Sequence, residues 1–174
     1  MATISNGREG AARLALEIDI SQPVHATGMV RRGCVALNSC LDLVLAEVAY
    51  AVGEAELFTH QVMLQSGDLR AFADGVVQLL NGEVGEIALD VGSPELGLQL
   101  RRHDRPTNGR RSTALMRRNP HPRLTLLAYV DTGVMAGAGS VSRAGPAMLL
   151  EPSVDETRAF GRDLRSEVEL ALCL

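Results

Sequence analysis

The chain contains no tryptophan, two tyrosines and three phenylalanines, so aromatic residues make up only 3% of its 174 residues. Nucleic-acid platforms and sugar-binding sites stack their ligands on aromatic faces, and this composition therefore disfavours both classes of site. No run of apolar residues approaches the ~18 that a membrane-spanning helix needs. We therefore expect neither a membrane protein nor a base-stacking one.

Lysine is also absent, because all 17 basic residues are arginines. A GC-rich coding bias is the simpler explanation, since Ala, Gly, Val and Leu are abundant as well. The alternative is selection for guanidinium groups, which hold carboxylates and phosphates through two parallel hydrogen bonds. Composition alone does not separate these two explanations.

Cysteine is scarce and poorly placed for a metal. Five residues separate Cys34 from Cys40, a longer spacing than zinc sites use, and the third cysteine is Cys173. An odd number of cysteines also argues against a disulfide framework. We expect each to be a small buried hydrophobe, and we expect neither a metal site nor a cofactor.

The overall composition is that of an ordinary globular protein, with 46% hydrophobic and 22% charged residues. The length predicts a single domain covering residues 1–174. Residues 1–10 are polar and are expected to form a flexible N-terminus. Because they contain no apolar signal segment, we also expect a cytoplasmic location. Residues 132–145 are rich in glycine and predict a flexible loop.

Alternation of apolar and polar residues predicts strands before the first helix and again after it. Leu14, Leu16 and Ile18 occupy alternate positions and Glu17 and Asp19 the positions after Leu16 and Ile18, which is typical of a half-buried strand. Val62 and Leu64 continue the alternation of a second strand. Strands are predicted at residues 12–20, 24–32, 35–52, 56–65, 86–91, 96–101, 112–118, 123–130 and at a short segment ending at 148–150.

Two helices are predicted from apolar residues that recur at helical spacing. The first covers Asp68–Leu80, with Ser66 as its N-terminal cap and Asn81-Gly82 as its stop. The second covers residues 154–172, and Ser153 with Glu156 forms a capping box. Because each element has one apolar face, the sequence predicts an α+β fold. We expect a predominantly antiparallel sheet backed by these two amphipathic helices.

The two predicted helices begin with similar sequences. Met63-Leu64 precedes Ser66, Asp68 and Arg70-Ala71-Phe72, whereas Met148-Leu149 precedes Ser153, Asp155 and Arg158-Ala159-Phe160. A duplicated strand–helix unit explains the similarity, and so does a chance match in a chain rich in alanine and leucine.

No catalytic motif of known spacing is present, and the four histidines are widely separated in the sequence. We predict no catalytic residue from spacing. A catalytic pair could nevertheless assemble in three dimensions from Glu47, Asp90 or Asp131. An enzyme whose site exists only in the folded chain therefore stays an alternative.

Charge is strongly segregated along the chain. Eight arginines and one acid, Asp104, lie between Arg101 and Arg123, so this segment carries +7 and the rest of the chain carries −11 of the total −4. The Asn108-Gly109 pair predicts a hairpin turn within the segment. The candidate partner-binding residues are Arg101, Arg102, Arg105, Arg110, Arg111, Arg117 and Arg118.

Two interpretations of this arginine segment are open. A basic hairpin can bind nucleic acid or another phosphate ligand. The preferred interpretation is that the arginines pair with acids on neighbouring strands, because the acidic pI of about 5.6 and the scarcity of aromatic residues argue against nucleic acid. The acidic remainder of the chain suits a basic protein partner, since complementary charge accelerates association.

The order of these patterns resembles that of the WapI-type immunity proteins and related bacterial domains. The similarity covers residues 55–172 and comprises Phe58, Val62-Met63-Leu64, Asp68-Leu69, Phe72, Leu96-Gly97-Leu98-Gln99-Leu100, Asp155, Phe160 and Leu164. The resemblance implies an antiparallel sheet backed by two helices. It also implies a cytoplasmic bacterial protein that neutralises a toxin by direct binding, without catalysis. No binding residue is carried over, because the similarity includes no fixed motif.

Overall fold

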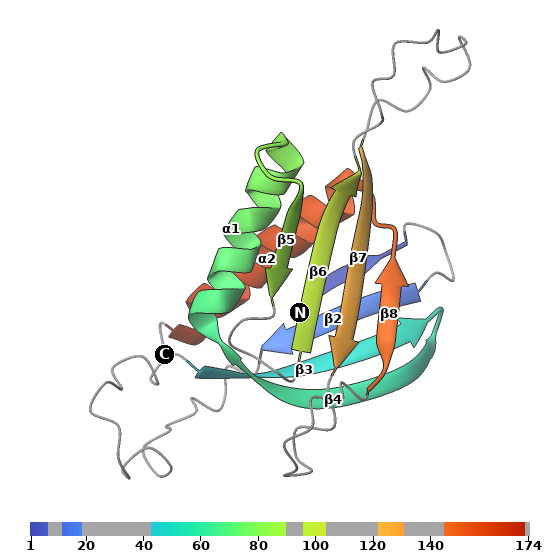
Figure 1. Ribbon diagram of the computed structural model, residues 1–174. Helices are drawn as coiled ribbons and strands as arrows, with labels where there is room; N and C mark the ends of the chain where they lie inside the picture. Colours follow the sequence, from blue (N-terminus) through green and yellow to red (C-terminus); the bar gives the residue numbers. More distant parts are fainter. Residues whose placement is uncertain (7–11, 19–42, 90–95, 104–121, 131–144, 173–174) are drawn as a thin grey trace, which may run out of the picture.

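The computed structural model describes residues 1–6, 12–18, 43–89, 96–103, 122–130 and 145–172 (Figure 1). Eight strands and two helices follow one another in these ranges. They are β1 (Ala2–Ser5), β2 (Ala12–Ile18), β3 (Leu43–Val52), β4 (Ala55–Gln65), α1 (Ser66–Asn81), β5 (Glu86–Leu89), β6 (Leu96–His103), β7 (Arg123–Val130), β8 (Ala147–Leu150) and α2 (Val154–Leu172).

The strands form two antiparallel sheets, each with its strands in sequence order. The first sheet contains β1–β4 and the second contains β5–β8. Each strand buries one face, and the two buried faces contribute to a single hydrophobic core together with both helices. The predicted α+β class is therefore confirmed, with the strands divided between two sheets that share this core.

The helices lie side by side and cover one edge of each sheet (Figure 1). α1 follows the first sheet but packs against β5, the first strand of the second sheet. α2 follows the second sheet but packs against β1 and β2 of the first. Each half of the chain thus supplies the helix that covers the other half.

This arrangement supports the duplicated strand–helix unit. Four strands and a helix occur twice in the same order, and each helix follows the last strand of its own sheet. Phe72 and Phe160 are each the seventh residue of their helix, and both side chains are buried. Ala73 and Gly161 follow them, so a small residue occupies the same buried position in both helices.

Most of the predicted elements are confirmed within the described residues, including the strand pair β3–β4 and both helices. The N-terminus differs from the prediction, because Ala2–Ser5 forms β1 and the side chains of Ala2 and Ile4 are buried. Four alternating residues are too few to distinguish a strand in the sequence. The predicted strands 24–32 and 112–118 and the Asn108-Gly109 turn lie outside the described residues, as does the predicted loop 132–145 except for its last residue.

The helix ends follow the sequence prediction with one correction. Ser66 is a buried residue inside α1, and the N-cap is Gln65, which makes no side-chain capping bond. Gly82 ends α1 with φ of 81°, a left-handed conformation that glycine adopts without strain. In α2 the predicted capping box is present: Ser153 Oγ accepts from Glu156 N at 3.2 Å, and Ser153 N donates to Glu156 Oε2 at 2.9 Å.

Leu164→Ala is expected to lower the free energy of unfolding by about 2–5 kcal/mol, because this side chain is fully buried between α2 and the sheets. The matched control is Leu170→Ala in the same helix, where the side chain is 51% exposed. Chemical denaturation should give less than about 0.5 kcal/mol for the control. Equal losses at both positions would show that the buried face of α2 is wrongly assigned.

Candidate binding surface

The solvent-facing side of the second sheet presents a continuous row of side chains from all four strands. They alternate with the buried residues of the same strands, and we call this side the outer face of the second sheet. Its members are Glu86, Ala88, Gly97, Gln99, Arg101, His103, Arg123, Thr125, Leu127, Tyr129, Ala147 and Leu149.

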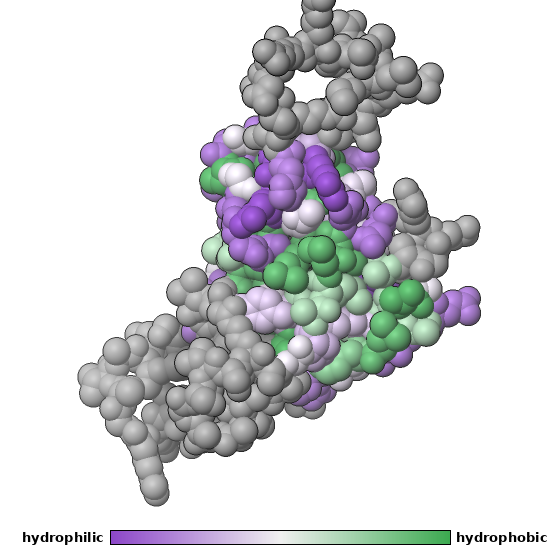
Figure 2. All heavy atoms as spheres, turned by 45° about the vertical axis from the view of Figure 1, so that its right-hand side comes forward, coloured by the Kyte–Doolittle hydropathy of each residue, from purple (hydrophilic) through white to green (hydrophobic). Residues whose placement is uncertain are grey.

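Apolar side chains occupy the middle of this face. Leu127 on β7 lies directly opposite Leu149 on β8, whose side chain is 62% exposed. Tyr129 lies opposite Gly97 on β6, and a Cβ atom on Gly97 would be 1.9 Å from Cζ of Tyr129. The glycine therefore lets the tyrosine ring lie flat against the sheet. Figure 2 shows hydrophobic side chains gathered in the middle of the visible surface, below a hydrophilic group.

The hydrophilic end of the outer face is built from paired charges. Arg101 donates from Nε to Glu86 Oε2 at 2.9 Å, and its Nη2 lies 2.7 Å from the same oxygen. Gln99 donates to the other oxygen of Glu86. These hydrogen bonds, mainly that of Arg101, lower the pKa of Glu86 below its usual value. Glu86 and Arg101 are directly opposite on β5 and β6, so sheet register brings them together.

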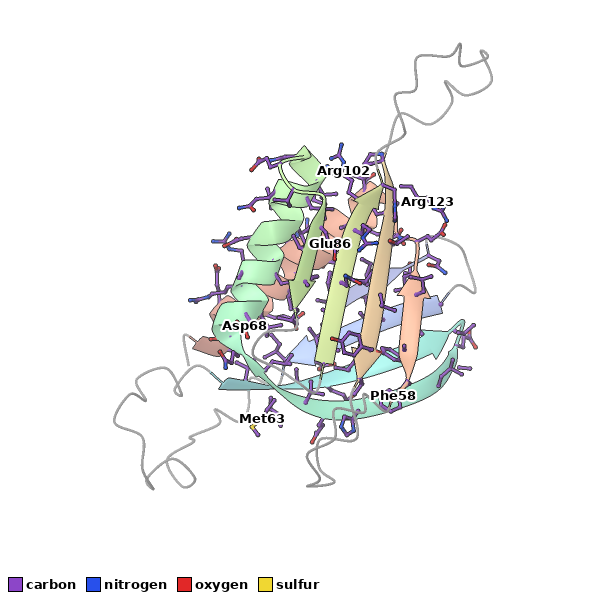
Figure 3. The ribbon with its side chains drawn as sticks, viewed as in Figure 1. Phe58, Met63, Asp68, Glu86, Arg102 and Arg123 are labelled. Carbon is purple, nitrogen blue, oxygen red and sulfur yellow. The ribbon has the colours of Figure 1, made fainter. Side chains whose placement is uncertain are left out.

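Two further polar contacts continue this end of the face. His103 Nε2 lies 2.9 Å from Thr125 Oγ1, and Arg123 forms an ion pair with Glu151. Figure 3 shows Glu86 and Arg123 towards the same upper end of the second sheet. Arg101 and Arg123 thus pair with acids on neighbouring segments, as the preferred interpretation of the arginine segment expects.

Arg102 has a different role from its neighbour Arg101. It lies on the opposite side of β6, and its Nη1 donates to the carbonyl oxygens of Leu79 at 3.1 Å and Leu80 at 2.9 Å. These carbonyls belong to the last turn of α1, which carries no basic residue of its own. Arg102 therefore caps the C-terminus of α1, where a cation stabilises the helix dipole.

The other candidate residues are not brought together by the described structure. Arg105, Arg110, Arg111, Arg117 and Arg118 lie outside the described residues, as do the alternative catalytic residues Asp90 and Asp131 and the three cysteines. Glu47 is exposed on the far side of the first sheet, directly opposite Glu17 on β2.

Within the described ranges, no group of three or more histidines, cysteines or acids is placed to hold a metal ion. The helices described there are also too short or too polar to cross a membrane.

Sequence reasoning missed the apolar centre of the outer face. The signal was present in β7, where Leu127 and Tyr129 occupy the solvent-facing positions between buried Leu126, Ala128 and Val130. A half-buried strand carries polar residues at those positions, so large apolar residues on both faces indicate a second contact surface.

A short aromatic row lies on the first sheet, where Tyr50 belongs to the hydrophobic core and Phe58 packs against it. Tyr50 and Phe58 are paired across β3 and β4 with ring centroids 5.6 Å apart, and His60 lies 5.9 Å from Phe58. The Tyr50 hydroxyl is buried and has no hydrogen-bond partner among the described residues. Burial raises the pKa of Tyr50 to about 12.

The chain matches no protein-family model, and a search of curated proteins returns no match in sequence. The resemblance to WapI-type immunity proteins therefore stays a hypothesis.

Arg102→Met is expected to destabilise the protein by about 1.5–3 kcal/mol, because two charge-assisted hydrogen bonds to the end of α1 are lost. Arg101→Met is the matched control, since it removes an exposed ion pair from the adjacent residue. Urea denaturation should show a clearly smaller loss for Arg101→Met. A larger loss for Arg101→Met than for Arg102→Met would contradict the capping role.

Tyr50 should ionise at a higher pH than an ordinary tyrosine. Tyr50 favours its neutral form in the folded protein, with a pKa of about 12 against the ordinary tyrosine value of 10.0. Its contribution to stability is therefore complete below pH 10 and is lost as the pH rises towards 12. Alkaline ultraviolet titration should show one step near pH 12 that disappears in Tyr50→Phe. This variant should be as stable as the wild type, since it removes a buried hydroxyl that lacks a described partner.

Proposed function

We propose that this protein is a non-enzymatic binding protein of the immunity type, which neutralises a cognate bacterial toxin in the cytoplasm by direct contact. The toxin binds the outer face of the second sheet. The observation that carries the proposal is the apolar centre formed by exposed Leu149 with half-buried Leu127 and Tyr129, next to side chains whose charges are already paired.

This layout matches the anatomy of a protein–protein interface. Such interfaces have an apolar core that is poor in charge and often rich in tyrosine, within a polar rim. At the outer face the rim is ordered in advance, because Glu86 holds both Gln99 and Arg101. A partner therefore does not have to immobilise these long side chains, which lowers the entropic cost of association.

Charge supports a basic partner. Glu17 and Glu47 are exposed and directly opposite on β2 and β3, an arrangement of like charges that destabilises a sheet. The net charge of −4, to which these two residues contribute, attracts a positively charged toxin at long range. Steering of this kind raises the association rate and weakens as salt concentration rises.

The alternative of an arginine hairpin that binds nucleic acid is less well supported. Arg101 and Arg123 are paired with acids and Arg102 caps a helix, so these three arginines are already used within the fold. If the segment did bind duplex DNA, the logarithm of affinity would fall with the logarithm of salt concentration by about 0.9 per phosphate contacted.

The test uses any toxin that is found encoded beside the gene for this protein, with Leu127→Ser and Leu149→Ser combined in one variant. Loss of a central apolar anchor should weaken toxin binding by about 30-fold or more and abolish protection of cells that express the toxin. The control combines Val77→Ser and Leu170→Ser, two exposed apolar residues on the helices. The control should bind and protect as the wild type does.

Three outcomes would contradict this proposal. Unchanged protection by the double serine variant would remove the outer face as the binding site. Failure of the wild-type protein to bind any neighbouring toxin would remove the immunity function. Tight, salt-sensitive binding to random duplex DNA, abolished by Arg110→Ala with Arg111→Ala, would favour the nucleic-acid alternative.

A further inference from the structure

The four edges of the two sheets differ in how they are protected. β1 lies against α2, and β5 lies against α1. β8 is an edge of only four residues. β4 is an edge of 11 residues, and within the described ranges no strand pairs with its outer side. Figure 1 shows β4 as the outermost strand of the first sheet.

The sequence of β4 lacks the devices that usually protect an edge strand. Natural edges carry lysine, proline or inward-pointing charges, because unpaired backbone groups are a template for another strand. Phe58–Leu64 contains no proline, arginine, aspartate or glutamate. A bulge between Tyr50 and Ala51 of the partner strand leaves Leu57 as the extra residue of β4, so the regular part begins at Phe58.

We propose that β4 pairs with β4 of a second copy of this chain, antiparallel about a two-fold axis through Gln61. The axis lies at the centre of Phe58–Leu64, and pairing joins the first sheets of both copies into one continuous sheet. A two-fold axis perpendicular to the sheet keeps the buried faces of both copies on the same side of the joined sheet. Residues that lie opposite each other must then point to the same face, so their numbers differ by an even number. The axis therefore lies at a residue and not between two residues.

The side-chain pattern of β4 suits a second copy. About Gln61, Phe58 lies opposite Leu64 and Thr59 opposite Met63 of the other copy, so each cross-strand pair includes an apolar residue. Gln61 lies opposite itself, where two amides can hydrogen-bond. Glu56, the one acid of β4, falls beyond the paired region, so no like charges oppose each other. Figure 3 shows Phe58 and Met63 towards opposite ends of the strand.

The dimer is expected to be weak, because a single strand pair buries less area than stable interfaces need. Analytical ultracentrifugation from about 1 μM to 1 mM covers the corresponding range of dissociation constants. The wild-type protein should shift from monomer to dimer within it. A monomer at every concentration would overturn the proposal, and pairing of β4 with a strand of another protein would then be the alternative.

Lysines at the axis locate the interface. Thr59→Lys with Gln61→Lys should weaken the dimer by about tenfold, because like charges then oppose each other across the strand pair. The control is Val77→Lys with Gln78→Lys, which adds the same charge to an exposed part of α1. A dimer weakened equally by both variants would place the contact elsewhere.

A charge exchange tests the register. Thr59→Lys and Met63→Glu lie four residues apart on one strand, too far to pair within a chain, but they oppose each other between copies. With both substitutions together, the dissociation constant of the dimer should be about 2–30-fold lower than with either alone, since two opposite-charge pairs form. No restoration would exclude the axis through Gln61. This dimer is independent of the toxin site, so its failure leaves the proposed function intact.

Discussion

The contact between α1 and α2 is the packing interaction on which the rest of this fold depends. Gly161 of α2 faces Val76 of α1 so closely that a Cβ atom would lie 2.9 Å from Val76 Cγ1. Arg165 of α2 also forms an ion pair with Asp74 of α1 at 2.7 Å. Because α1 covers β5 and α2 covers β1, each helix covers the first strand of the sheet that it does not follow, and this contact ties the two halves of the chain together.

The exchange of helices also decides which parts of the sheets stay open. The edges at β1 and β5 are covered, whereas β4 and β8 form the opposite edges. The core takes one face of each sheet. The two surfaces that we assign to partners, the outer face of the second sheet and the edge of β4, are both consequences of this arrangement.

Adjacent residues can therefore have unrelated roles. Arg101 and Arg102 are neighbours in sequence, but the strand directs one towards Glu86 on the outer face and the other towards the end of α1. The same alternation separates buried Leu126 from partly exposed Leu127. The function of each residue depends on the face it occupies more than on its residue type.

Local patterns in the sequence determined the elements of this protein. Alternation at Leu14, Leu16 and Ile18 specified β2, and the Ser153–Glu156 capping box specified the start of α2, because these signals lie within a few residues of one another. The resemblance between the two helix starts fitted either a duplicated unit or a chance match, and local patterns did not separate the two. These features require no knowledge of distant parts of the chain.

Only the tertiary structure decided the division into two sheets, the exchange of helices and the candidate surfaces. The short strand β1 is stabilised by pairing with β2 and by packing against α2, contacts that no local pattern of four residues reveals. The partners of Arg101 and Arg102 are likewise residues distant in the sequence, Glu86 and the end of α1. Side-chain roles of this kind arise from register and packing, which bring together residues that the sequence keeps apart.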